Sequence, residues 1–194
     1  MRRFLRIFIA FFCVFCLCSC QKEADPAAIA AHFASAQAMT ARVEMEIDCG
    51  SRVYPFSVDW RWSAEGSDVT ILAPESVAGV TAHAAPDGLT LTYGDTHLVL
   101  ADEDGTRSPT PPELLPLAFL QWQEGGGTAA MELLNGLPTV AIRWEETLSG
   151  VAIAQCTWFE PERMLPLRTE FSLDGQRTAI CTYPLFTLEN NKSE

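Results

Sequence analysis

The sequence predicts a mainly β protein with two short helices. Apolar and polar residues alternate over 41–49 and again over 54–62, which is the period of a strand with one buried and one solvated face. Gly-Asp at 94–95 and Asp-Gly at 174–175 are two-residue turn signals of the kind that join neighbouring antiparallel strands. Together these observations favour an antiparallel sheet built from hairpins.

Eight more segments have the composition and length of strands. They are 68–73, 80–85, 89–93, 96–100, 139–145, 151–159, 165–173 and 176–183. The turn at 94–95 sets Leu91 opposite Leu98 and Leu89 opposite Leu100, so these leucines should share one face of a hairpin.

Two segments lack the strand period and are expected to be helices. Residues 26–39 are rich in alanine, and Asp25 followed by Pro26 has the pattern of an N-cap with proline at the first helical position. The segment 111–122 follows a Thr-x-x-Glu capping box and is apolar on nearly every side, so it should be buried. Pro116 is expected to kink this helix or restrict it to one or two turns.

The N-terminus has the pattern of a bacterial lipoprotein signal. Three arginines precede an apolar run over 7–18, which has the length of a signal-peptide core and is too short for a comfortable membrane span. The run leads into Leu-Cys-Ser-Cys, which resembles a lipobox, where the last cysteine receives a diacylglyceryl group and the signal is cut before it. We therefore predict a signal peptide over 1–19, a tether over 20–25 lipidated at Cys20, and a single domain over 26–194. A secretory signal with an unmodified cysteine is the alternative.

The negative net charge of the chain makes nucleic acids and anionic lipid surfaces unfavourable partners. Removing 1–19 takes away three arginines and no acids, so the formal net charge changes from −12 to −15. A chain this acidic should neither neutralise nucleic-acid phosphates nor be attracted to anionic headgroups. The lipid on Cys20 is then the expected membrane anchor. It would hold the protein on the outer face of the cytoplasmic membrane, or at an outer membrane if the cell has one.

Three cysteines follow the lipobox, at Cys49, Cys156 and Cys181. An odd set this small does not indicate a disulfide framework. The predicted hairpin turns place both Cys156 and Cys181 opposite Arg168, two strands apart, which is about 9.6 Å. A disulfide needs alpha carbons within about 7 Å, so we expect free thiols.

The sequence contains no recognisable motif for catalysis, a cofactor or a metal. His32, His83 and His97 lack the spacing of a zinc helix, and no Gly-x-Ser-x-Gly elbow is present. The glycines at 125–127 lack the lysine of a phosphate loop and are better explained as a helix end. The alternating acids of 44–48 are interpreted as a solvated strand face. We therefore expect a protein that is not an enzyme, with no cofactor other than the covalent lipid.

Aromatic residues are the candidate binding residues. The candidate hydrophobic binding face comprises Tyr54, Phe56, Trp60, Trp62, Phe119, Trp122 and Trp158. Packing in the core is the simpler role for any one of them. An exposed apolar surface of this kind would otherwise mark a binding site.

Three segments resemble a known group of lipoproteins. They are VTILAPESVAGV at 69–80, LTLTYGD at 89–95 and WFEPERMLPLRTEFSLDG at 158–175. On these residues the chain is similar to the lipoprotein-localisation carriers of the LolA, LolB and RseB superfamily, and most of all to clostridial spore-germination lipoproteins of the GerS type. The resemblance implies a strongly curved antiparallel sheet, an open half-barrel, with helices on its concave side. It also implies an acyl-chain ligand in the concavity or a cell-wall amidase as partner.

Three functions follow as hypotheses. The first is a membrane-anchored, extracytoplasmic binding module for a protein partner or hydrophobic ligand, in envelope or spore-cortex processing. The second is a lipid or lipoprotein chaperone. A protein tethered by its own lipid cannot travel far, which disfavours free shuttling of acyl chains but allows it to receive them. The third is a cell-wall enzyme, for which the sequence offers no motif.

Overall fold

The computed structural model describes residues 25–85, 88–100 and 109–190, and the predicted lipidation site Cys20 lies outside them. The helical segments are α2 (Pro26–Ala34), the 3-10 turn η1 (Glu75–Val77) and α3 (Pro111–Glu124). The strands are β1 (Ala36–Asp48), β2 (Val53–Ser63), β3 (Gly66–Ala73), β4 (Thr81–Ala85), β5 (Gly88–Tyr93), β6 (Thr96–Leu100), β7 (Thr128–Leu134), β8 (Leu137–Leu148), β9 (Val151–Phe159), β10 (Pro166–Leu173) and β11 (Gln176–Asn190).

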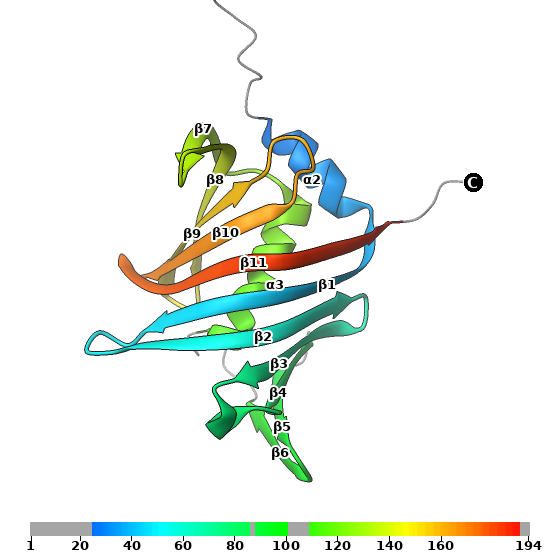
Figure 1. Ribbon diagram of the computed structural model, residues 1–194, viewed down its shortest axis with the longest axis vertical. Coiled ribbons are helices and arrows are strands. Elements are labelled where there is room, and N and C mark those ends of the chain that lie inside the picture. The colour runs from blue at the N-terminus through cyan, green and yellow to red at the C-terminus, as the bar shows by residue number, and fades with distance from the viewer. Residues whose placement is uncertain (1–24, 86–87, 101–108, 191–194) are drawn as a thin grey trace, which may run out of the picture.

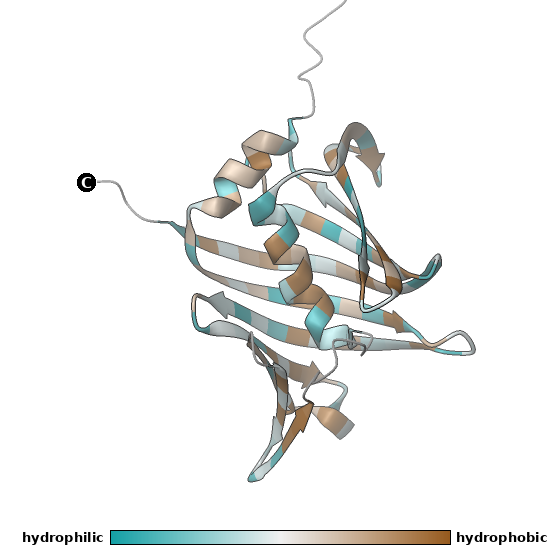
Figure 2. Ribbon diagram, turned by 180° about the vertical axis from the view of Figure 1, so that it is seen from behind, coloured by the Kyte–Doolittle hydropathy of each residue, from teal (hydrophilic) through white to brown (hydrophobic). Residues whose placement is uncertain are grey.

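All eleven strands belong to one sheet, in the order β6-β5-β4-β3-β2-β1-β11-β10-β9-β8-β7. Each strand is antiparallel to its neighbours, and among the described residues β6 and β7 form the two ends of the sheet and do not pair with each other. The sheet curves around α3, as Figures 1 and 2 show from opposite sides. The predicted fold class, an open half-barrel with helices on its concave side, is confirmed.

Alternation along the central strands gives the sheet two different faces. On β1, Met39, Val43 and Met45 are buried on the concave side. Arg42 lies on the convex side, where its Nε is 2.7 Å from Oδ1 of Asp59 on β2. The period of two that is visible in the sequence therefore corresponds to one core face and one solvated face.

Helix α2 is shorter than predicted, and the expected helix over 26–39 is wrong in its C-terminal part. Asp25 is the N-cap as predicted, with Oδ1 accepting a hydrogen bond from the Ala27 backbone N–H at 2.9 Å. From Ala36 the chain is part of β1, where it pairs with Asn190 at the end of β11. Pairing of β1 on both sides thus overrides the helix propensity of the alanines.

Helix α3 is longer than predicted. It continues for 14 residues through Pro116, so the expected restriction to one or two turns is wrong. The predicted capping pair is present, since the Glu113 carboxylate accepts from the backbone N–H and the hydroxyl of Thr110 at 2.6 Å each. A proline inside a helix costs about 3 kcal/mol. Burial of six α3 side chains, each large apolar one contributing about 1.5–3 kcal/mol, offsets this cost.

The sequence did not indicate β7. Its residues, Thr-Ala-Ala-Met-Glu-Leu-Leu, include good helix formers and lack a regular alternation. The β7–β8 hairpin closes through Asn135 and Gly136, with φ of 52° and 82°, as a two-residue turn of the primed type requires. This Asn-Gly pair is the sequence signal that would have found the hairpin.

The predicted pairings are correct in one hairpin and shifted in another. The leucine pairs of the β5–β6 hairpin are confirmed. In the β10–β11 hairpin the pairing at the turn is as predicted, but a bulge beside Phe171 shifts the pairs that follow. Cys181 therefore lies opposite Thr169 and Cys156 lies opposite Glu170, and the predicted placement of both opposite Arg168 is wrong.

Candidate functional site

Three of the seven candidate aromatic residues form the centre of the core. Trp60 of β2 and Phe119 and Trp122 of α3 have no exposed surface. The Phe119 ring centroid lies 6.1 Å from that of Trp60 and 6.0 Å from that of Trp122, in edge-to-face arrangements. These side chains fill the middle of the concave face, so a ligand would have to bind elsewhere on it.

A chain of buried hydrogen bonds connects Trp122 to the sheet. Its Nε1–H donates to Thr157 Oγ1 at 3.1 Å, the hydroxyls of Thr157 and Thr169 lie 3.0 Å apart, and the Tyr183 hydroxyl donates to Thr169 at 2.9 Å. Burial raises the pKa of Tyr183 well above its usual value, which keeps the phenol protonated and able to donate. If α3 moved away, the buried Trp122 N–H would lose its acceptor Thr157, whose hydroxyl is itself fixed by Thr169, so this bond helps to hold the helix in place.

The other four candidate aromatic residues are divided between two faces. Trp62 of β2 is half-buried against the core, and Tyr54 and Phe56 lie further along the same strand at the edge of a cavity. Trp158 of β9 lies on the convex face, where its Nε1–H donates to Glu132 at 3.0 Å. The structure therefore brings Tyr54, Phe56 and Trp62 to one side of the sheet and separates Trp158 from them.

An apolar cavity of about 260 Å³ lies between the ends of β1, β2 and β3 and the start of α3. Its lining residues are Met45, Ile47, Cys49, Tyr54, Phe56, Val58, Val69, Ile71, Pro111 and Pro112. No charged residue is among these described lining residues. Tyr54 is 43% exposed and Cys49 is also exposed, so the two mark the side on which the cavity opens to solvent.

The cavity follows from the strand alternation and from the place where α3 begins. Ile47 pairs with Tyr54, and Met45 pairs with Phe56, so two successive pairs turn apolar side chains to the concave side. Only the first residues of α3, from Pro111, reach this end of the sheet. The large aromatic side chains of the helix come later and fill the middle instead.

A cavity of this composition can hold an apolar group. Ligand sites in proteins are mostly apolar and commonly have volumes of about 300–1,000 Å³, so this one is close to the lower end of that range. It suits part of an acyl chain or an apolar side chain of a partner. The sequence predicted two of its residues, Tyr54 and Phe56. It missed the aliphatic ones, although the alternation over 41–49 already placed Met45 and Ile47 on one strand face.

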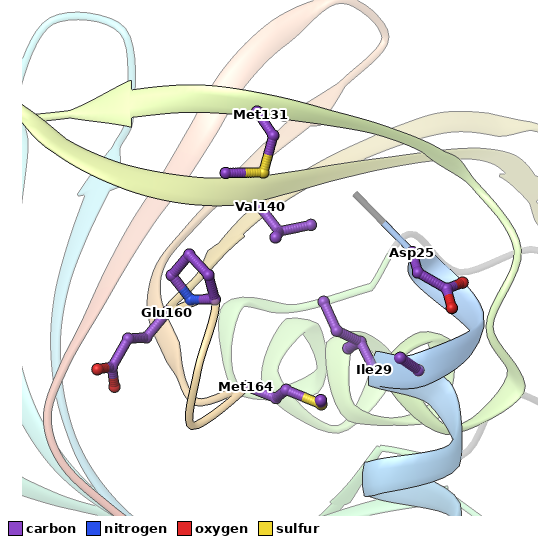
Figure 3. A pocket seen from close by; sticks show the side chains of 8 residues that line it. Asp25, Ile29, Met131, Val140, Glu160 and Met164 are labelled. Atoms are coloured by element: carbon purple, nitrogen blue, oxygen red, sulfur yellow. The ribbon is translucent and has the colours of Figure 1, made fainter. Parts of the chain in front are cut away.

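A second, smaller cavity of about 60 Å³ lies at the start of α2 (Figure 3). Ile29 of α2, Met131 and Val140 of the β7–β8 hairpin, and Met164 of the β9–β10 turn contribute apolar side chains to it, and Asp25 lies at its edge. The cavity shows that the β7–β8 hairpin is a neighbour of the first described residue of the chain.

The polar candidates from the sequence have local partners on the sheet surface. Glu44 accepts a hydrogen bond from Ser57 at 2.9 Å, and His83 Nδ1 lies 2.7 Å from Asp68 Oδ1. Among the residues that the structure describes, no group of three or more His, Cys, Asp or Glu side chains is placed to hold a metal ion. Within the same residues, no helix combines the length and apolar character needed to span a bilayer.

The three thiols of the domain differ in burial. Cys49 is exposed, Cys156 is half-buried and Cys181 is buried, and all three are free. Residues next to Cys156 on β9 face the core, so Cys156 lies on the convex face, whereas Cys181 lies in the core. Burial raises the pKa of the Cys156 thiol to about 11 and also raises the pKa of Cys181.

These differences predict an order of thiol reactivity. In a soluble version beginning at Gln21, we expect an alkylating reagent at pH 8 to modify Cys49 rapidly, Cys156 slowly and Cys181 only after unfolding, because the thiolate is the reactive form. Mass spectrometry of peptides from a time course would measure the three rates. Rapid modification of Cys181 in the folded protein would contradict the burial that the structure gives it.

No protein-family model matches this chain. No curated protein is significantly similar to it in sequence.

Comparison with solved structures gives matches of low identity that span most of the chain. A LolA superfamily protein from Nitrosomonas europaea is 10% identical, over 85% of this chain and 94% of that chain, with a TM-score of 0.44. The lipoprotein LppX of Mycobacterium tuberculosis is 16% identical, over 88% of this chain and 98% of that chain, with a TM-score of 0.43. A chain of the complex between the CwlD amidase and the GerS lipoprotein of Clostridioides difficile is 8% identical, over 91% and 97%, with a TM-score of 0.34.

With each of these TM-scores below 0.5, the likeness supports no conclusion about a ligand, a partner or a site residue of this chain.

Proposed function

We propose that this chain is a lipid-anchored, extracytoplasmic binding protein that takes an apolar group into the cavity beside Tyr54 and Phe56. The group is either an acyl chain or an apolar side chain of a protein partner. The observation that carries the proposal is the cavity itself, which is about 260 Å³ in volume, open to solvent and lined by uncharged, mostly aliphatic and aromatic residues.

Because α3 is attached to the sheet, we infer that a ligand binds in the existing cavity and that the helix does not have to move. The helix is connected to the sheet through Trp122 and the buried hydroxyls of Thr157 and Thr169. The cavity lies beyond this connection, at the N-terminal end of the helix. A ligand can therefore enter there while the rest of the core stays packed.

The lipid anchor is proposed from the N-terminal sequence. Leu-Cys-Ser-Cys ending at Cys20 resembles a lipobox, and the acidic chain that follows has no charge-based attraction to anionic lipid. Two acyl chains on one sulfur would be enough for stable attachment to a membrane. The anchored protein would then present its cavity in the space outside the cytoplasmic membrane.

A charge placed in the cavity should weaken the binding of an apolar ligand there. We expect the neutral apolar dye N-phenyl-1-naphthylamine to bind the wild-type domain, and Ile71→Glu to raise its Kd at least tenfold, because a carboxylate there must be dehydrated when the dye enters. A fluorescence titration of the soluble domain measures both Kd values. Bound dye should also slow the alkylation of Cys49 at the edge of the cavity.

Leu72 provides the matched control. It follows Ile71 on β3, is 37% exposed and is not among the cavity residues. Leu72→Glu adds the same charge one residue away and should leave the Kd unchanged. If the two glutamate variants bind the dye equally well, or if the wild-type domain does not bind it, the cavity is not the binding site.

A further inference from the structure

The tip of the β7–β8 hairpin exposes large apolar side chains. Leu133 is 72% exposed and Leu137 is 62% exposed, and Met131, on the same strand face as Leu133, is 36% exposed. Leu134 and Leu137 flank the two-residue turn at Asn135 and Gly136, and Leu133 pairs with Pro138 one residue further from it. Leu133 and Leu137 therefore lie on opposite faces of the hairpin tip. Side chains of this kind are usually buried, so exposed leucines on both faces of one turn indicate that the tip as a whole enters an apolar environment.

The hairpin tip is also free of charge in a highly charged chain. The segment Leu-Leu-Asn-Gly-Leu-Pro over 133–138 has no ionisable side chain, although 20% of the whole chain is charged. The nearest acid, Glu132, is engaged on the convex face, where it accepts hydrogen bonds from Arg143 at 2.6 Å and from Trp158 at 3.0 Å. The hydrogen bond from Arg143 is the main cause of the lowered pKa of Glu132, so the pair stays ionised and mutually neutralised.

The position of the tip brings it close to the lipid anchor. Met131 of β7 and Asp25 line the same small cavity (Figure 3), and Leu133 follows Met131 by about 7 Å along the strand. Asp25 follows Cys20 by five residue steps, and a chain of that length spans at most about 18 Å. A lipid on Cys20 would therefore hold the hairpin within reach of the bilayer surface.

We propose that the tip of the β7–β8 hairpin, through Leu133 and Leu137, inserts into the surface of the bilayer that holds the lipid of Cys20. This inference rests on the proposed lipid anchor and adds a second, non-covalent contact that fixes the orientation of the domain. The bilayer is the favoured occupant because the surface is uncharged and apolar, lies on a protruding turn and is close to the attachment point. The exposed edge strand β6, at the opposite end of the molecule in Figure 1, is expected to remain in water.

Spin labels on the lipidated full-length protein in phosphatidylcholine vesicles test this orientation. With Cys49 and Cys156 replaced by serine, one label is attached at Pro138→Cys beside the tip and another at Thr96→Cys beside the turn of the β5–β6 hairpin. Both positions are exposed in the structure. We expect the label at 138 to be more accessible to oxygen than to a water-soluble nickel reagent, and the label at 96 to show the reverse.

Two double variants serve as matched tests of the leucines. Leu133→Ser with Leu137→Ser should return the label at 138 to water, whereas Leu98→Ser with Val99→Ser, at comparably exposed positions of β6, should leave it in the bilayer. All four residues are exposed, so the fold is retained.

Each result decides between the proposals. A water-exposed label at 138 on vesicle-bound protein would overturn the bilayer contact and assign the leucines to a protein surface, while leaving the lipid anchor intact. A protein that does not float with the vesicles would instead refute the anchor, and with it the inserted hairpin.

Discussion

Replacing Cys20 with serine is expected to move the protein from the membrane fraction to the soluble fraction of the envelope. The reason is that each buried methylene of the lipid contributes about 0.8 kcal/mol, so two acyl chains dominate membrane attachment. The hairpin leucines alone bury too few methylenes to replace them. Cell fractionation measures the change, and the mass of the N-terminal peptide shows whether a diacylglyceryl group is present.

Cys49→Ser is the control for this experiment. It removes another exposed thiol of the same chain and should leave the membrane fraction unchanged. If the Cys20→Ser protein stays in the membrane fraction, and the wild-type N-terminal peptide has no lipid, the signal is an ordinary secretory one. The binding cavity would then belong to a protein without a lipid anchor.

Trp122→Ala is expected to lower the free energy of unfolding of the soluble domain by about 3–5 kcal/mol, which is a large part of the stability of a domain of this size. The substitution leaves a cavity at a fully buried site and removes the donor to Thr157. Both effects act on the interface between α3 and the sheet. Equilibrium unfolding in urea measures the change, with the slope of the transition unchanged.

Two further variants separate the causes. Trp158→Ala removes the same side chain from the half-buried convex position, where we expect a cost of about 1 kcal/mol. Trp122→Phe keeps most of the ring and removes the N–H donor, so its cost should be about 1–3 kcal/mol. A cost below about 1 kcal/mol for Trp122→Ala would show that α3 is a loosely attached lid.

The alternation of apolar residues was the reliable guide to this fold. It placed β1 and β2 and their buried faces correctly, because one side of these strands packs on the core and the other meets water. It failed where pairing, and not propensity, decides the structure. The alanines that follow Ser35 join β1, and the helix-forming residues of β7 pair with β8, since the hydrogen bonds to neighbouring strands outweigh the preference of single residues.

The candidate site could be predicted only in part for a different reason. Tyr54 and Phe56 were recognised as aromatic residues of one strand face, but so was Trp60, which is a core residue, and Trp122 of the predicted helix is another. What separates the two groups is the point at which α3 begins relative to the strands. That point depends on three-dimensional packing, and a pattern along one chain does not contain it.

The placement of the thiols on different faces has a consequence for the maturation of the protein. Outside the cytoplasm, neighbouring cysteines are exposed to oxidation and can form incorrect disulfides. Cys156 and Cys181 are divided by the thickness of the sheet, and Cys49 lies apart on another strand end. In the extracytoplasmic setting proposed above, this separation would keep the thiols of the folded domain from pairing within one molecule.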